Sequence, residues 1–378
     1  MLHLKIALKE LDISQAAFGA ALGLSEPSVA QIGNHGIWPK RRDQLAARIR
    51  DYLADQGATP EQIRTAFERV DGSTKQPPQK EDDMYLRHQR LHPETLRTFK
   101  LRKDPFRDDL NGPEDVFFSP EHRYISEEMM QTAKRGGMLA VIGESGSGKT
   151  TLRTLLLERL AEEPVIIIEP SILGMEEDNS RGRVVKADAV AASIVSAFPG
   201  HTPKGGIEAK TRQIGKLLQD SVQGGYSHVL IIEEAHSLSL ATLKHLKRFA
   251  EIGRGFRKWL GIILVGQPEL LTKLSQRSAE VREVVQRITP ITLPPLGEHL
   301  PAYVAFKLDR IGAKTEAIFA PDAMPAIADC LTDSHNGSRV HPLAVNNLLT
   351  AAMNLAAGIG SSKVTGDIIK RAIREARQ

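Results

Sequence analysis

The sequence predicts an α/β fold: a P-loop core with a parallel sheet, followed by a helical C-terminal region and preceded by a small all-α domain. Between about residues 105 and 295, apolar runs alternate with amphipathic stretches, which is the pattern of a parallel α/β sheet. One of these runs leads directly into GESGSGKT at 143–150, which fills every fixed position of the phosphate-loop motif G-x-x-x-x-G-K-[ST]. The flanking segments 1–70 and 298–378 are typical of helices alone.

The composition is that of a globular protein of two or three domains, with 378 residues, 41% hydrophobic and 25% charged. A single cysteine, Cys330, excludes a disulfide scaffold and is typical of a reducing compartment. No apolar run approaches the roughly 20 residues of a membrane span, and the N-terminus does not resemble a signal peptide. We therefore expect a cytoplasmic protein without a membrane partner. The net charge of +4 permits nucleic-acid binding without demanding it.

Changes in composition and hydrophobic pattern divide the chain into four parts. We expect a helix-turn-helix domain at 1–70, a linker and basic arm at 71–103, the P-loop core at 104–297, and a helical region with a tail at 298–378. The arm is basic, with 7 Lys/Arg against 4 Asp/Glu between residues 76 and 103. Such a charge run is either an arm that follows DNA or a solvated helix face, and the sequence leaves both open.

The N-terminal pattern resembles the small helix-turn-helix domains of phage repressors. Gly23 would occupy the turn, Ser25 would cap the second helix, and Leu24, Val29 and Ile32 would point inward. The residues expected to face DNA are Ser28, Gln31, Lys40, Arg41 and Arg42. Residues 1–75 hold 10 Lys/Arg against 9 Asp/Glu, so a bundle that docks onto another protein stays open as an alternative.

The core should contain five strands, each a short apolar run. They are expected at Met138–Ile142, Val165–Glu169, Val229–Ile232, Leu260–Val265 and Ile291–Leu293. In a parallel sheet the residues that follow these strands meet at one edge, which is where ligands of such folds bind.

The phosphate loop follows the first strand and precedes an amphipathic helix, which is the context that the motif requires. Its glycines let backbone N–H groups point at phosphate oxygens. Lys149 would reach the β- and γ-phosphates, and the Thr150 hydroxyl would bind Mg²⁺. The predicted nucleotide-binding residues are Gly143, Glu144, Ser145, Gly146, Ser147, Gly148, Lys149, Thr150 and Thr151.

A second acidic site follows the strand Val229–Ile232. Glu233 stands at the end of this strand, where its carboxylate can hold Mg²⁺ directly or through water. Glu234 comes next and can orient and deprotonate the attacking water. The alternative is a buried strand that simply ends in two surface carboxylates.

These two motifs resemble those of AAA+ ATPases, in which Asp is usual at the position of Glu233. The extra methylene displaces the carboxylate, and Mg²⁺ accepts little geometric error, so we expect nucleotide binding with slow hydrolysis that DNA or a partner stimulates. The resemblance places Gln267 as sensor 1, which positions the water or γ-phosphate. Gln267 could instead cap the loop before Pro268.

The resemblance also implies two functional arginines. Arg287 matches the arginine finger, which enters the nucleotide site of a neighbouring subunit; Arg277 and Arg282 are rivals, and a surface ion pair is the alternative for each. Arg339 matches sensor 2, at the start of a long helix expected to run through Leu355.

Two aromatic segments resemble those that pack beside the adenine in this family. They are Asp104–Phe106 and Phe117–Pro120, and core packing explains their aromatic side chains equally well.

The ordered set of motifs between 104 and 357 resembles MuB- and TnsC-type regulators of DNA transposition and the ExeA-type secretion ATPases. The resemblance implies a protein that binds ATP and Mg²⁺, oligomerises as a ring or helical filament on duplex DNA with little sequence preference, and recruits a transposase. Arg181, Arg183 and Lys186 are DNA-facing candidates in the core, although a solvated loop explains them as well. An ExeA-like secretion ATPase and a nucleotide-switched transcription regulator remain alternatives.

Overall fold

The computed structural model divides into two compact units, Met1–Met84 and Tyr85–Gln378. In the first unit it describes residues 4, 8, 11, 13, 15–24, 29, 32, 42–56, 58 and 60–67. In the second it describes 86, 88–107, 110–170, 187–275, 285–333 and 337–376.

The first unit is helical around a small apolar core. Its described helices are α2 (Gln15–Leu22), α4 (Arg42–Asp55) and α5 (Pro60–Thr65). Phe18, Ile32 and Ile49 are among its fully buried side chains. Gly23 has φ 63°, the left-handed conformation expected of the turn. Since the segment 25–28 lies outside the described residues, the helix-turn-helix remains a prediction.

The second unit is built on a parallel five-stranded sheet in the order β2-β3-β6-β1-β7. The strands are β1 (Gly137–Ile142), β2 (Val165–Ile168), β3 (Ser227–Ile232), β6 (Gly261–Gly266) and β7 (Ile288–Thr292). These confirm the five expected strands, with β7 beginning three residues earlier than predicted. The sheet is apolar on both faces because helices cover both faces. A two-stranded hairpin, β4 (Gly253–Arg254) and β5 (Arg257–Lys258), precedes β6.

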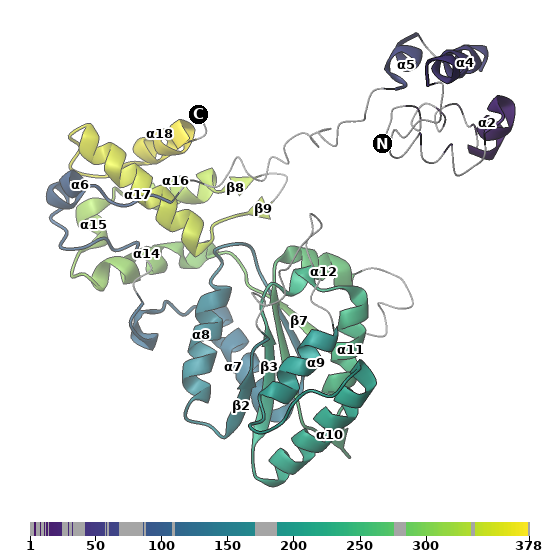
Figure 1. Ribbon diagram of the computed structural model, residues 1–378. Coiled ribbons are helices and arrows are strands. Elements are labelled where there is room, and N and C mark those ends of the chain that lie inside the picture. Colours follow the sequence, from purple (N-terminus) through teal and green to yellow (C-terminus); the bar gives the residue numbers. More distant parts are fainter. Residues whose placement is uncertain are drawn as a thin grey trace. The chain divides into compact units, whose positions relative to one another are not determined.

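Alternate residues of the central strands enter two separate cores. Met138 and Ile142 of β1 pack with α9, α10 and α11, whereas Leu139 and Val141 pack with α7 and α8. Figure 1 shows these two helix layers on either side of the sheet. The helices are α7 (Pro120–Arg135), α8 (Lys149–Leu160), α9 (Ala187–Ser196), α10 (Ile207–Gln223), α11 (Leu240–Ala250) and α12 (Pro268–Leu274), with 3₁₀ turns η2 (Pro113–Asp115) and η4 (Ala235–Ser237).

A helical lid follows the sheet after η5 (Gly297–His299). It comprises α14 (Leu300–Asp309), α15 (Thr315–Ile318), α16 (Ala323–Cys330), α17 (Pro342–Gly358) and α18 (Gly366–Ala376). Its core includes Val304, Leu348 and Met353, all fully buried. Among the described residues, no helix is both long and apolar enough to cross a bilayer.

The segment expected to be a free basic arm instead belongs partly to the lid. Leu91, Phe99 and Leu101 are buried in the lid core, and α6 (Pro93–Thr98) packs on α17. Asn354 of α17 accepts hydrogen bonds from the His92 N–H at 3.0 Å and from the Thr95 hydroxyl at 2.7 Å. The arm therefore cannot follow DNA beyond residue 86 without leaving the lid. The sequence did not predict this packing because the apolar residues of the segment are spaced among charged ones.

The long helix of the lid begins later than predicted. Gly337–Ser338 forms β9, which pairs with β8 (Thr332–Asp333), so the region after 298 is not purely helical. Helix α17 starts at Pro342, because proline suits a first helical position and His341 before it is extended, with ψ 153°. Arg339 therefore lies in the connection between β9 and α17, not at a helix start.

Candidate nucleotide site

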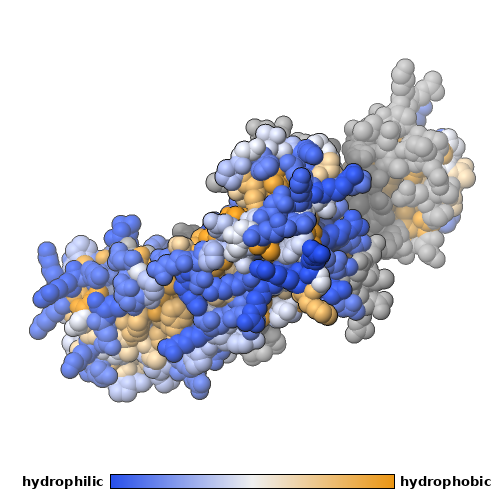
Figure 2. Space-filling view, turned by 90° about the horizontal axis from the view of Figure 1, so that it is seen from below, coloured by the Kyte–Doolittle hydropathy of each residue, from blue (hydrophilic) through white to orange (hydrophobic). Residues whose placement is uncertain are grey.

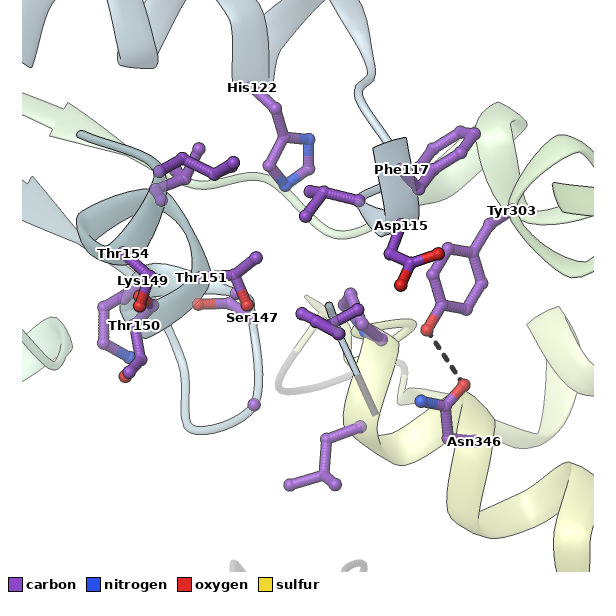
Figure 3. Close-up of a pocket in the computed structure, with 18 of the residues that line it drawn as sticks. Asp115, Phe117, His122, Ser147, Lys149, Thr150, Thr151, Thr154, Tyr303 and Asn346 are labelled. Carbon is purple, nitrogen blue, oxygen red and sulfur yellow. Dashed lines mark hydrogen bonds between the residues drawn. The ribbon is translucent and has the colours of Figure 1, made fainter. Parts of the chain in front are cut away.

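A cavity of about 630 Å³ lies between the phosphate loop and the lid. This volume is within the range of small-molecule sites. The loop residues Ser145–Thr151 line one side, and Tyr303 of α14 and Asn346 of α17 line the other. Figure 3 shows this arrangement, with Asp115 and Phe117 beside Tyr303. Every residue predicted to bind nucleotide between Ser145 and Thr151 therefore borders one cavity.

The loop has the backbone that phosphate binding requires. Gly146 has φ 73° and Gly148 has φ 102°, conformations that side chains with a Cβ rarely adopt. Helix α8 begins at Lys149, so its first N–H groups lack helical partners and face the cavity entrance with the positive end of the dipole. The Lys149 ammonium donates to the Gly143 and Glu144 carbonyls, both at 2.7 Å, which holds the loop curled.

Partial burial changes the pKa of Lys149 in a way that favours a bound anion. Desolvation lowers its pKa below the ordinary 10.5, and the carboxylates of Glu234, Glu144 and Glu269 oppose that shift. A bound phosphate would oppose it further, because a negative charge nearby favours the ammonium form. The lysine is thus better satisfied with phosphate present than without it.

Three buried polar atoms near the loop have no hydrogen-bond partner among the described residues: Ser147 Oγ, Arg339 Nη1 and His341 Nδ1. Such atoms are costly unless something satisfies them. A polyphosphate offers acceptor oxygens to all three types of donor. The residues present therefore fit a nucleoside triphosphate.

His341 is a member of this set that the sequence analysis missed. Desolvation lowers its pKa to about 4, and the charges of Lys149 and Arg339 add to the shift. The imidazole is therefore neutral at pH 7. Neither Arg339 nor His341 lines the cavity itself; the residue after His341, Pro342, does. The available signal was a polar residue directly before Pro342, the start of α17.

The lid touches the phosphate loop directly. The Leu343 N–H in the first turn of α17 donates to the Gly146 carbonyl at 3.2 Å. A Cβ at Gly146 would overlap the Leu343 side chain, so glycine is needed here for close approach as well as for its φ. Any rearrangement of the loop around phosphate is thereby transmitted to α17.

The two predicted carboxylates have different surroundings. Glu234 lines the cavity and has φ 48°, a strained conformation for a residue with a side chain, of the kind that clusters at functional sites. Its carboxylate lies 3.4 Å from His236, and His236 Nδ1 accepts the Gln267 N–H at 3.4 Å. Gln267 also lines the cavity, and its side chain makes no capping bond to α12, so the loop-capping alternative fails.

Glu233 turns away from this group. Its carboxylate lies 3.8 Å from Arg153, which also pairs with Glu169. Thr150 lines the cavity, and Glu233 directly follows β3 at the same edge of the sheet, so a hydroxyl and a carboxylate suited to Mg²⁺ are both present. When bound, the ion would neutralise charge on the phosphate oxygens. Arg153 competes for the carboxylate that would hold it.

The far end of the cavity is aromatic. Phe117 packs edge-on against Tyr303 with ring centroids 5.5 Å apart, and the Tyr303 hydroxyl donates to Asn346 at 2.9 Å. An ion pair between Arg310 and Asp115, 2.8 Å long, joins lid to core beside it. Phe117 is thus placed to contact a base. Phe106, the other aromatic residue proposed beside the adenine, is instead buried in the lid core.

His122 of α7 also borders the cavity and was not predicted. Its Nδ1 lies 2.7 Å from the hydroxyl of Ser119, which caps α7. Desolvation lowers the pKa of its ring, although the charge of Glu121 and a hydrogen bond with the Ser147 backbone oppose the shift. His122 therefore contacts the phosphate loop at the Ser147 backbone. Nothing in its sequence spacing marks it.

Arg287 lies at the opposite edge of the sheet from the loop. It precedes β7, whose first residue Ile288 pairs with Met138 near the start of β1, and it contacts Glu251 at 3.4 Å. This exposed ion pair is the alternative that the sequence left open for Arg287, and its role as an arginine finger stays a prediction. The remaining candidates lie outside the described residues or have undescribed side chains: Arg277, Arg282, Ser28, Gln31, Lys40, Arg41, Arg42, Arg181, Arg183 and Lys186.

Comparison with known proteins agrees with this site. Residues 131–274 match the family described as "AAA domain". General secretion pathway protein A of Aeromonas hydrophila is 28% identical over 269 residues, which cover 68% of this chain and 45% of that protein. The chain thus spans less than half the length of this relative.

Three solved structures are also similar. The Aeropyrum pernix ORC2 protein in ADPNP–ADP complexes has 15% identity and a TM-score of 0.46, over 73% of this chain and 72% of that chain. Drosophila ORC bound to DNA has 15% identity and a TM-score of 0.48, over 79% and 73%. The Thermotoga maritima RuvB Holliday junction branch migration motor has 14% identity and a TM-score of 0.40, over 68% and 69%.

The matched family and the geometry of the loop lead to one conclusion. Residues 131–274 of the second unit match an AAA domain and the unit has the P-loop α/β fold, which supports ATP hydrolysis with ATP and Mg²⁺ as cofactors. This confirms the predicted fold class and the predicted enzyme class.

Proposed function

We propose that this protein is an ATP-dependent AAA+ regulator of DNA transposition, which assembles on target duplex DNA and recruits or activates a transposase. The observation that carries the proposal is the separation of Arg287 from the phosphate loop across the whole sheet. A six-residue strand such as β1 is roughly 20 Å long, far beyond the reach of an arginine side chain. As an arginine finger, Arg287 of one subunit would therefore complete a neighbour's site, and ATP binding would favour assembly.

Within one subunit, nucleotide binding would act on the lid. Phosphate oxygens would accept hydrogen bonds from Lys149, Ser147 and His341, which now lack good partners or bond to the loop itself. Because Leu343 is bonded to Gly146, the lid would settle on the occupied loop as one body. Glu234, beside Gln267, would then take a proton from the attacking water.

The DNA part of the proposal rests on the N-terminal unit and on the ordered motifs of the core. The helix-turn-helix pattern ahead of a linker resembles the arrangement in MuB-type regulators. An asymmetric contact between identical subunits gives a filament when its rotation does not close, and duplex DNA is a suitable axis for such a filament. Binding would be governed by phosphate contacts and would show little sequence preference.

A secretion-associated ATPase is the second candidate, and one observation favours it. The 28% identity with General secretion pathway protein A extends over 269 residues, beyond the matched AAA domain. In that case the same ATP-driven assembly would act on secretion instead of on DNA. The two candidates therefore differ in what the assembly contacts.

The test compares the wild-type chain with Glu234→Gln. We expect duplex DNA to stimulate ATP hydrolysis by the wild type, and the variant to hydrolyse about 10²- to 10⁴-fold more slowly while binding ATP normally. Because the variant holds ATP, it should form stable oligomers on DNA that are visible by electron microscopy. Wild-type turnover that ignores DNA, together with monomers only, would remove the DNA proposal and leave the secretion candidate.

A further inference from the structure

The hairpin β4–β5 presents an unusual group of side chains. The six residues Gly253–Lys258 read GRGFRK, with three cations and no acid. Gly255 has φ 62° and forms the tight turn with Phe256. Phe256 is fully exposed at the tip, where it buries nothing against the rest of the chain. A single exposed hydrophobic side chain is common on protein surfaces, so Phe256 is informative only together with the cations beside it.

The two strands of the hairpin place like charges opposite each other. Arg254 pairs in register with Arg257, and Lys258 is next along the strand. Like charges directly opposite across strands are destabilising. No carboxylate among the described residues forms an ion pair with any of these three cations. A polyanion would relieve the repulsion, whereas a neutral partner would not.

The hairpin is held firmly to the body of the domain. A Cβ at Gly136 would overlap Lys258, so the base of the hairpin packs against the turn before β1. The Trp259 N–H donates to the Ile252 carbonyl at 3.0 Å, which closes the hairpin at its base. The base of the hairpin that carries Arg254 and Phe256 is thus held in place. Binding would therefore cost mainly the conformational entropy of these two side chains.

The sheet brings further groups to the same edge. Parallel strands all begin at one edge, so the residues that precede β1, β3 and β6 lie together there. These residues include Arg135, Tyr226 and Lys258. A small cavity lined by Lys134, Ser227, Arg257 and Lys258 shows that the hairpin adjoins the end of α7 and the start of β3. Tyr226 is half-exposed there.

We infer that this amino edge, formed by Arg135, Tyr226 and the hairpin Gly253–Lys258, is a contact surface for duplex DNA. The inference rests on the proposed function and names its contact surface within the core. Cations without partners suit phosphates, and an aromatic tip can pack on sugars or enter a groove. Figure 2, seen from below the view of Figure 1, shows many hydrophilic side chains interspersed with apolar ones over the described residues of this face.

The experiment uses the full chain with a non-hydrolysable ATP analogue and a fluorescent duplex, and measures binding by anisotropy at several salt concentrations. The double variant Arg254→Ala/Arg257→Ala should lower the slope of log affinity against log salt by about 1.8, because each phosphate contact contributes about 0.9. Phe256→Ser should weaken binding at fixed salt without changing the slope. The matched control is Arg212→Ala/Arg371→Ala, which removes two exposed cations from α10 and α18.

Several results would overturn the inference. A wild-type slope in the hairpin variant, or an equal change in the control, would do so while leaving the proposed function intact. Loss of ATP-dependent assembly without DNA, measured by sedimentation, would reassign the surface to a subunit contact. Loss of binding to vesicles containing anionic phospholipid, with DNA binding retained, would reassign it to lipid. If the wild type binds no DNA at low salt, the proposed function itself fails.

Discussion

The two edges of the central sheet both carry cations, but they treat those cations differently. At the carboxyl edge Lys149 and Arg339 are partly or largely buried, and the polar atoms beside them are short of partners. At the amino edge Arg254 and Arg257 are exposed and face each other. Partly buried cations beside polar atoms that lack partners suit one compact anion of defined shape. An exposed row suits a long anion of no fixed register. The degree of burial of the cations therefore indicates which kind of anion each edge can bind, a compact one or a long one.

The largest expected effect concerns a residue at the amino edge that acts on the carboxyl edge of a neighbour. Arg287→Ala should lower ATP turnover of the assembled protein by about 10³-fold or more, as loss of an arginine finger does elsewhere. Its own site keeps all its residues, so ATP affinity of the dilute monomer should not change. Phosphate release and fluorescent-nucleotide binding measure the two quantities. Turnover at wild-type level would show that the edges do not cooperate and would move the finger to Arg277 or Arg282.

A second prediction separates buried from exposed lysine at opposite edges. Lys149→Ala should weaken ATP binding by about 10- to 150-fold, the range expected for a hydrogen bond to a charged group. Lys134→Ala is the matched control, since Lys134 is exposed and pairs with Glu163 at 2.6 Å. Calorimetry with ATP measures both variants. Equal losses in the two would mean that burial does not distinguish the edges.

The smallest effect is the pH dependence that His341 contributes beside the phosphate loop. His341 has a pKa of about 4 in the folded chain and an ordinary value of 6.5 when unfolded. Because the folded state binds its proton less tightly, its stabilising contribution is complete above pH 6.5 and is lost as the pH falls toward 4. We expect about 2 kcal/mol less free energy of unfolding at pH 5 than at pH 7 from this group.

The measurement for His341 is urea unfolding of the wild type and of His341→Gln at both pH values. The difference between the two proteins isolates this group, because His122 and His228, whose pKa values burial also lowers, are present in both. The variant should lose the extra destabilisation at pH 5. If the two proteins respond to pH identically, His341 is not buried beside Lys149 and Arg339 as described.

The carboxyl edge was far easier to predict from sequence than the amino edge. The loop at 143–150 and the pair Glu233–Glu234 are contiguous, so their chemistry is written in a short string next to an apolar strand. His122 and His341 are distant in sequence from the loop and meet it only through packing. The hairpin GRGFRK matches no known sequence motif. Its proposed role in binding depends on the strand register that places Arg254 opposite Arg257.

Domain boundaries were harder to predict than strands because they depend on which hydrophobic core buries each apolar residue. Leu91 and Leu101 are spaced among charges as on a solvated helix, yet both are buried under the lid. The helix expected after Gly337 failed for a local reason: the β8–β9 pairing removes Gly337 and Ser338, and Pro342 sets a new start. Hydrophobic periodicity in the sequence predicts neither long-range packing nor short hairpins.

The bond between the Leu343 N–H and the Gly146 carbonyl has a consequence for timing. Loop and lid are joined at this point, so we expect release of ADP to require loosening of α17. The lifetime of each assembled subunit would then be governed by the opening of the lid after hydrolysis, not by the bond-breaking step itself. The slow hydrolysis expected from Glu233 and a lid bonded to the phosphate loop would together act as a timer, in which the lid sets how long the assembly persists.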